Sequence, residues 1–205
     1  MQGITIVYSV IVLIMSVVVH EVAHGYAALF LGDPTAKYAK RLTLNPLKHL
    51  DILGSVIVPL ITVMSGGFLF GWAKPVPYNP YNLKNPRSGS AIIALAGPIA
   101  NLCIALIAAL SVNLFADILN APTLVLLISI VFINIALMVF NLIPIYPLDG
   151  SKVLFFFLPA QYDHIKEGFI RYSLFIFIVF ILFFSNYLAM VIGYIASFLL
   201  PHVGI

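Results

Sequence analysis

Long runs of apolar residues, separated by short polar segments, make up most of the chain. A helix needs about 20 consecutive apolar residues to cross the hydrocarbon core of a membrane. Four runs meet that length, at residues 4–31, 89–116, 122–143 and 168–200. This pattern predicts at least four membrane-spanning helices.

The last run and a fifth, interrupted one leave the number of helices open. Residues 168–200 exceed the length of one span, and Ser185 and Asn186 in their middle favour a hairpin over one tilted helix. Residues 52–72 contain a proline and a Gly-Gly pair, which weaken a regular helix. We therefore expect about four to six membrane helices, with a re-entrant or β-ribbon segment between the first two core helices.

Composition supports a membrane protein and limits the fold class. Of the 205 residues, 62% are hydrophobic and 8% are charged, whereas soluble domains are about 45–50% apolar and about 25% charged. The net charge of +3 then indicates basic cytoplasmic loops rather than nucleic-acid binding. We expect an all-α polytopic membrane protein with a single domain, 1–205, made of a core at 4–155 and a C-terminal helix or hairpin at 165–201.

The first apolar run carries an HExxH motif at His20, Glu21 and His24. Residues i and i+4 share one face of a helix, so both imidazoles can reach one Zn²⁺, and Glu21 beside them can take a proton from water. The alternative is a pair of structural histidines bonded to the backbone or to each other. Ionised groups at mid-bilayer cost about 2.5–3.5 kcal/mol and are usually functional, and a bound cation gives all three a shared role.

A third metal ligand must come from elsewhere, because catalytic zinc sites use three protein ligands and one open position. Asp149 is the best candidate, since it follows a long apolar run that Pro144 and Pro147 break. Irregular backbone at membrane depth is tolerated where it lines a cavity. The alternative is a solvated Asp-Gly turn at the membrane surface. We expect one Zn²⁺ per chain.

Three phrases together resemble the site-2 protease family of intramembrane zinc metalloproteases, in its short prokaryotic form without a PDZ domain. They are HEVAH at 20–24, AGPIAN at 96–101 and NLIPIYPLDG at 141–150, and the resemblance covers about residues 10–155. The resemblance implies that His20, His24 and Asp149 are the zinc ligands and that Glu21 is the catalytic base. It also implies that Asn141 contacts the substrate or the tetrahedral intermediate.

The resemblance also implies an activity, a location and partners. It implies a zinc endopeptidase of the prokaryotic plasma membrane that cuts peptide bonds in or near transmembrane segments, as in regulated intramembrane proteolysis. Anti-sigma-factor-like proteins and signal-peptide remnants are the implied substrates, with the lipid bilayer as surroundings and no nucleic acid. A metal transporter or sensor is the alternative, because intramembrane His and Asp residues also mark ion paths.

The depth of the metal ligands in the membrane and the positions of the basic loop residues predict the same topology. Asp149 reaches the depth of the histidines if 4–31 and 122–143 run in the same direction, so that only 89–116 crosses between them. The basic loop residues then share one side of the membrane, as the positive-inside rule requires, and the connection at 117–121 has no Lys or Arg. Both arguments favour a re-entrant 52–72 and an active site nearer the cytoplasmic side.

A substrate helix hides its peptide bonds in its own hydrogen bonds, so it must unwind before cleavage. Residues 41–45 alternate in a way that suits a strand. That strand, with Thr43 in its middle, or part of 52–72, is expected to pair with the unwound substrate. A self-paired ribbon is the alternative.

Several further residues have less specific expected roles. For Asn141, a helix–helix hydrogen bond stands equal to a contact with the oxyanion. Asn101 and Asn134 are expected to make structural bonds. Gly97 is expected to set close helix packing or a kink, and Lys152 to be a solvated anchor at the membrane interface.

Overall fold

The computed structural model describes residues 2–49, 51 and 74–201, and all regular elements of this part are helices. The long helices are α1 (Gln2–Phe30), α4 (Pro86–Phe115), α5 (Ala121–Asn141) and α8 (Ser173–Leu199). The shorter elements are α2 (Thr35–Tyr38), η1 (Pro46–Lys48), η3 (Pro80–Asn82), α6 (Asp149–Phe157), η4 (Ala160–Tyr162) and α7 (Asp163–Arg171). The predicted all-α class is confirmed.

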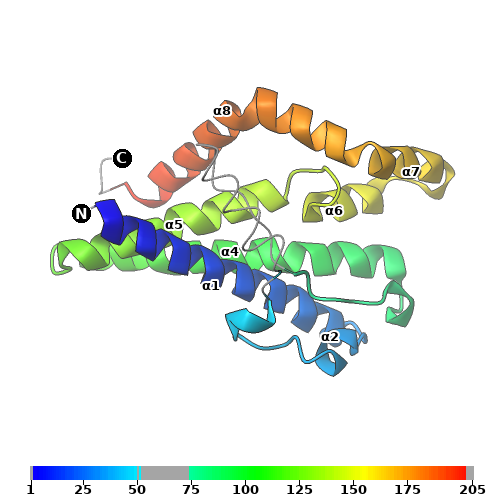
Figure 1. Cartoon of the computed structure of the whole chain (residues 1–205), viewed down its shortest axis with the longest axis horizontal. Coiled ribbons are helices and arrows are strands. Elements are labelled where there is room, and N and C mark those ends of the chain that lie inside the picture. Colours follow the sequence, from blue (N-terminus) through cyan, green and yellow to red (C-terminus); the bar gives the residue numbers. More distant parts are fainter. Residues whose placement is uncertain (1, 50, 52–73, 202–205) are drawn as a thin grey trace.

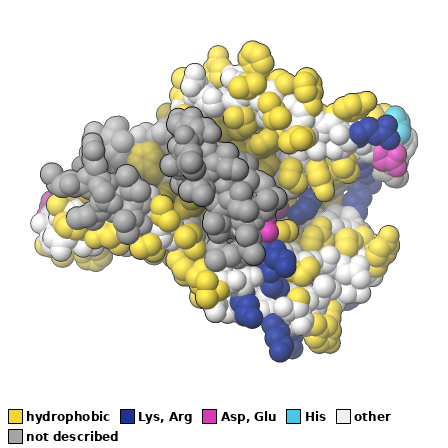
Figure 2. Space-filling model, in the orientation of Figure 1, with side chains coloured by type: hydrophobic (Ala, Val, Ile, Leu, Met, Phe, Trp, Pro, Cys, Tyr) yellow, Lys and Arg dark blue, Asp and Glu magenta, His cyan; other side chains and the backbone are white. Residues whose placement is uncertain are grey.

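Four helices are long and apolar enough to cross a membrane: Tyr8–Phe30 within α1, and the whole of α4, α5 and α8. Large apolar side chains lie exposed along them, such as Ile107 on α4 and Phe183 on α8. Figure 2 shows hydrophobic side chains over much of the visible outer surface. Such a surface is stable in lipid, so the chain is an integral membrane protein.

The C-terminal run forms one long helix, so the predicted hairpin is wrong. Helix α8 continues through Ser185 and Asn186, and its ribbon bends along its length (Figure 1). Both residues lower helix propensity by less than about 0.7 kcal/mol, and neither breaks a helix as proline does. The 27 residues of α8 span about 40 Å, close to the full thickness of a bilayer.

Helices α1, α4 and α5 form the core, with α4 antiparallel to the other two (Figure 1). On α1, Ser16 lies against Asn101 of α4 and Asn134 of α5. Further along α1, His24 contacts Ile93, which precedes Asn101 in α4. The two helices therefore run in opposite directions. Because α1 and α5 run in the same direction, their C-terminal ends meet at one end of the bundle, as the positions of the metal ligands predicted.

Residues 41–45 are irregular with a bend at Thr43, so the strand predicted for them is not formed. The Thr43 N–H donates to the Arg41 carbonyl at 3.0 Å, and the Thr43 carbonyl accepts from His49 Nε2 at 2.8 Å. The Asn45 side chain then caps η1. Pairing of this segment with an unwound substrate stays a prediction. The re-entrant segment predicted at 52–72 lies outside the described residues.

Asp33 links the end of α1 to the segment before α4 through hydrogen bonds. Its carboxylate, which is fully buried, accepts hydrogen bonds from the Asn79 N–H at 2.6 Å, Asn82 Nδ2 at 2.7 Å and Thr35. Burial alone would raise the pKa of Asp33, but the hydrogen bonds from Thr35, Asn82 and Asn79 outweigh it and lower that pKa. The ionised carboxylate therefore stabilises this junction.

Asp33→Asn is expected to lower the free energy of unfolding by about 1–3 kcal/mol, because an amide leaves buried donors without their acceptor. The pKa of Asp33 is lower in the folded state, so its contribution is complete above its unfolded value of 3.8 and is lost as the pH falls below it. Thermal unfolding in detergent should show this acid-dependent loss in the wild type and less of it in the variant. The exposed Asp117→Asn is the matched control, and an equal pH dependence in all three proteins would contradict the role of Asp33.

Candidate metal centre

Helix α1 brings His20 and His24 together on one buried face, as their i, i+4 spacing predicts. Their Nε2 atoms lie 3.0 Å apart. Asp149 Oδ2 lies 3.2 Å from His20 Nε2 and 3.0 Å from His24 Nε2. One ligand atom from each of the three residues thus converges on one point, in the arrangement of a three-ligand metal site.

Nδ1 of each histidine faces away from the cluster, and its hydrogen bond determines where Nε2 points. His20 Nδ1 donates to Asn101 Oδ1 at 2.5 Å, and His24 Nδ1 donates to the Ile93 carbonyl at 2.6 Å. Because both acceptors lack a proton, each Nδ1 carries the hydrogen, and in a neutral ring Nε2 presents its lone pair. Such outer hydrogen bonds orient metal-ligating histidines.

The residues fit a metal ion. In the neutral-ring state, two nitrogen lone pairs and a carboxylate oxygen face one another at 3.0–3.2 Å, a repulsive arrangement that a cation relieves. A tetrahedral zinc ion with bonds of about 2.0–2.1 Å holds its ligand atoms about 3.3 Å apart, close to the observed spacing. Two imidazoles and one carboxylate are also a donor set found in catalytic zinc sites.

Asp149 is the first residue of α6 and directly follows the irregular segment that connects α5 with α6. Its two oxygens face different partners, because Oδ2 meets the histidines and Oδ1 lies 3.3 Å from Lys152 Nζ. Lys152 therefore contacts the ligand carboxylate, where the sequence predicted a solvated anchor.

Glu21 lies beside the ligands in a pocket of about 140 Å³. Its Oε2 accepts a hydrogen bond from the Val76 N–H at 2.7 Å, which fixes the carboxylate at the pocket wall. Pro75, Val76 and Tyr78 complete that wall together with the three ligands. Sequence reasoning missed the contribution of Val76, since a backbone donor 55 residues away leaves no pattern in the sequence.

Asn141, the last residue of α5, also lines this pocket. Its Nδ2 donates to the Leu137 carbonyl one turn earlier at 2.9 Å, so it is anchored to its own helix. Thr43, the other residue expected to meet a substrate, is not among the residues that line the pocket. The structure thus brings Asn141 to the ligands and leaves Thr43 outside this pocket.

A buried polar network extends from the ligands into the bundle. Asn101, which holds His20, donates through Nδ2 to Asn134 Oδ1 at 2.8 Å, and Asn134 donates to Ser16 Oγ at 2.9 Å. The structural bonds expected for the two asparagines are therefore confirmed. The contact of Asn101 with a ligand was not predicted, although Asn101 ends the AGPIAN phrase that carried part of the family resemblance.

Gly97 allows α4 to pass directly against the ligands. A Cβ at this position would lie 2.6 Å from His20 Nε2 and 2.6 Å from His24 Cε1. Real Cβ atoms do not approach other heavy atoms so closely, so only glycine fits between α4 and the two rings. The close packing predicted for Gly97 is confirmed.

Asn101→Leu is expected to weaken Zn²⁺ binding about 10–100-fold, the usual effect of losing a partner that orients a ligand. The change removes the acceptor that holds Nδ1 of His20 and leaves the three ligands in place. Competition with a chromophoric chelator in detergent measures the affinity. Asn186→Leu, at an exposed position on α8, is the matched control, and equal affinities in the two variants would contradict the role of Asn101.

Comparisons with known proteins show which family the chain belongs to. The sequence model described as Peptidase family M50 matches residues 116–184, which include Asn141 and Asp149. YwhC of Bacillus subtilis is 40% identical over 154 residues, which cover 72% of this chain and 67% of YwhC. The chain belongs to peptidase family M50. The resemblance to site-2 proteases found in the sequence is thereby confirmed.

A more distant relative is also similar to this M50 chain. Rip2 of Mycolicibacterium smegmatis is 32% identical over 141 residues, which cover 69% of the M50 chain and 53% of Rip2. The chain therefore spans about half the length of Rip2. The names of YwhC and Rip2 both contain the words zinc metalloprotease, and no solved structure matches the M50 chain.

Proposed function

We propose that this chain is an intramembrane zinc endopeptidase that hydrolyses peptide bonds in or near the transmembrane segments of other membrane proteins. One observation carries the proposal: a buried cluster of two histidines and one aspartate, with a glutamate beside it, inside a bundle of membrane-spanning helices. A metallopeptidase site at this depth meets peptide bonds that lie in the bilayer.

In this proposal His20, His24 and Asp149 hold one Zn²⁺. When bound, zinc acts as a Lewis acid that polarises a carbonyl group and lowers the pKa of water toward about 7. Glu21 takes a proton from the attacking water and passes it to the departing amine nitrogen. The hydrogen bond from the Val76 N–H keeps the Glu21 carboxylate aimed into the pocket during both transfers.

Asn141 is the candidate for a further catalytic contact. It lines the pocket that holds the ligands and Glu21, and its Nδ2 is a donor. Rotation of this amide away from the Leu137 carbonyl lets it donate to the oxygen that gains negative charge during hydrolysis. One such donor typically contributes about 10²–10³-fold to the rate.

The metal centre can act only on peptide bonds that its substrate exposes. In a transmembrane helix every peptide bond is closed by the helix's own hydrogen bonds. A transmembrane substrate therefore has to enter as a locally unwound segment. Single-span proteins, including anti-sigma-factor-like regulators and signal-peptide remnants, are the substrate class that the family resemblance supports.

Comparative membrane proteomics of cells with the wild-type chain and with Glu21→Gln tests this function. The inactive variant should accumulate intact single-span proteins that the wild type converts into shorter fragments. Identical fragment patterns in the two strains would contradict the proposed activity. Flux of zinc that persists in Glu21→Gln, without any change in the fragments, would support a transporter instead.

We also propose that the site opens nearer the cytoplasmic side of the plasma membrane. The segments that flank α1, α4 and α6 at the end of the bundle with Asp149 carry most of the basic residues, whereas the connection between α4 and α5 has none. The positive-inside rule assigns the basic end to the cytoplasm.

Cysteine labelling in a Cys103→Ser background checks this orientation. Tyr81→Cys, at an exposed position before α4, should react with a membrane-impermeant maleimide only after the cells are opened. Ile118→Cys, exposed in the connection between α4 and α5, should react in intact cells. The reverse pattern would contradict the proposed orientation.

A further inference from the structure

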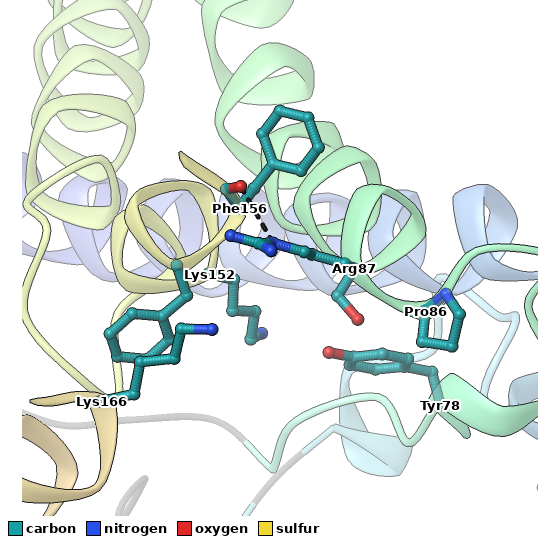
Figure 3. Close-up of a pocket in the computed structure, with 8 residues that line it drawn as sticks. Tyr78, Pro86, Arg87, Lys152, Phe156 and Lys166 are labelled. Atoms are coloured by element: carbon teal, nitrogen blue, oxygen red, sulfur yellow. Dashed lines mark hydrogen bonds between the residues drawn. The ribbon is translucent and has the colours of Figure 1, made fainter. Parts of the chain in front are cut away.

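A second cavity, of about 240 Å³, adjoins the pocket of the metal centre. Tyr78 and Lys152 line both spaces, so the two cavities share a wall. The remaining wall comes from the start of α4 and from α6 and α7, with Arg87, Phe155 and Lys166 among its residues (Figure 3). A peptide that leaves the metal centre on the Tyr78 side therefore meets this cavity.

Three cationic side chains, from three different helices, line the second cavity, and its described lining includes no carboxylate. They are Arg87 on α4, Lys152 on α6 and Lys166 on α7. Figure 3 shows the three side chains around the cavity, with the Arg87 guanidinium group turned toward the Phe156 carbonyl. Cationic side chains that line a partly enclosed space attract an anion to it.

Arg87 and Lys152 are held at the cavity wall by contacts with the protein. Arg87 Nε donates to the Phe156 carbonyl at 3.0 Å, which fixes the plane of the guanidinium group. Lys152 Nζ lies 5.6 Å from the centre of the Tyr78 ring and 3.3 Å from Asp149 Oδ1. Lys152 thus connects the cavity to the outer oxygen of a metal ligand, so an anion here lies next to the reaction site.

We propose that this cavity is a specificity subsite that binds an acidic side chain of the substrate, close to the peptide bond that is cut. The inference rests on the proposed function. A carboxylate suits the three cations, and the aromatic walls from Tyr78 and Phe155 suit the methylene groups of a glutamate. The shared wall favours a substrate residue over a lipid headgroup, because it places the anion in line with the metal centre.

Binding of model peptides to the full-length, zinc-loaded Glu21→Gln protein in phosphatidylcholine vesicles tests the subsite without any cleavage. The peptides have one apolar span of roughly 20 residues and one Glu, which is moved in single steps along the juxtamembrane part. Each has a Gln counterpart. At one or two adjacent positions the Glu peptide should bind about fivefold more tightly than its counterpart, the size that one partly screened ion pair supplies.

Variants of the cavity assign that preference to its residues. Arg87→Gln and Lys166→Gln should each reduce the preference for Glu, and Arg87→Glu should favour a Lys peptide at the same position. Lys166→Gln, on a separate helix, keeps the test valid if Arg87→Gln loosens the contact of α4 with α6. Lys37→Gln, at an exposed position on α2, removes the same charge elsewhere and should leave the preference unchanged.

Three outcomes would overturn the subsite: equal binding of Glu and Gln peptides at every position, a preference unchanged in both cavity variants, or a preference that disappears in vesicles with phosphatidylglycerol. The last outcome would assign the cavity to an anionic lipid headgroup. Cleavage of the same peptides by the wild-type protein is measured in parallel. Binding preference without cleavage would contradict the proposed function alone, and cleavage without preference would contradict the subsite alone.

Discussion

Replacement of Glu21 by Gln is expected to abolish peptide-bond cleavage and to leave the metal in place. The side chain is not a member of the converging ligand triad, and Gln has nearly the same shape and can still accept the Val76 hydrogen bond. It cannot take a proton from water. General-base catalysis contributes about 10²–10⁴-fold to a rate, so cleavage should fall by at least that factor while zinc content stays at one per chain.

The sequence contains a matched control for this change. Glu167 is the other glutamate of the chain, and it lies exposed on α7. Glu167→Gln removes the same charge from the same residue type and should retain full activity. Purified proteins in detergent, with zinc measured by mass spectrometry and cleavage by peptide fragments, give both readouts. Cleavage by Glu21→Gln at the rate of the wild type would exclude Glu21 as the base.

Gly97→Ala is expected to remove both metal and activity, although glycine offers no ligand. The added methyl carbon would lie 2.6 Å from atoms of both histidine rings, so α4 or the rings must shift and the three ligand atoms no longer converge. Loss of an orienting contact weakens metal binding about 10–100-fold. Displacement of two ligands should exceed that loss, and zinc content should fall toward zero.

Gly193→Ala on α8 is the control for Gly97→Ala. A Cβ at Gly193 meets no atom within 4 Å, and Ala is the better helix former by about 1 kcal/mol. This variant should therefore bind zinc and cleave as the wild type does. Zinc content in Gly97→Ala equal to that in Gly193→Ala would contradict the close passage of α4 over the ligands.

The metal centre could be predicted from sequence because its main parts follow local rules. The i, i+4 spacing of His20 and His24 determines their common helix face without any tertiary information. Asp149 could be chosen because two prolines break an apolar run before it, and that choice in turn predicted that α1 and α5 run in the same direction. Long apolar runs likewise predicted the membrane helices.

The features that failed or were missed depend on contacts between distant segments. The alternation at 41–45 predicted a strand, but the Arg41 side chain is held by the Lys74 carbonyl at 2.6 Å, and the Thr43 carbonyl is held by the His49 side chain. Ser185 and Asn186 looked like a turn, yet α8 continues because neither residue breaks it. Asn101 acts on a residue 81 positions away, which sequence spacing does not reveal.

Cleavage by the purified chain as zinc is titrated tests the central claim most directly. The protein is stripped with a chelator, reconstituted in vesicles with a single-span substrate, and given increasing Zn²⁺. Cleavage should be absent at the start and should rise to a plateau at one zinc per chain, with no plateau activity in Glu21→Gln. Cleavage by the stripped protein, or zinc binding at this stoichiometry without cleavage of any single-span substrate, would contradict the account.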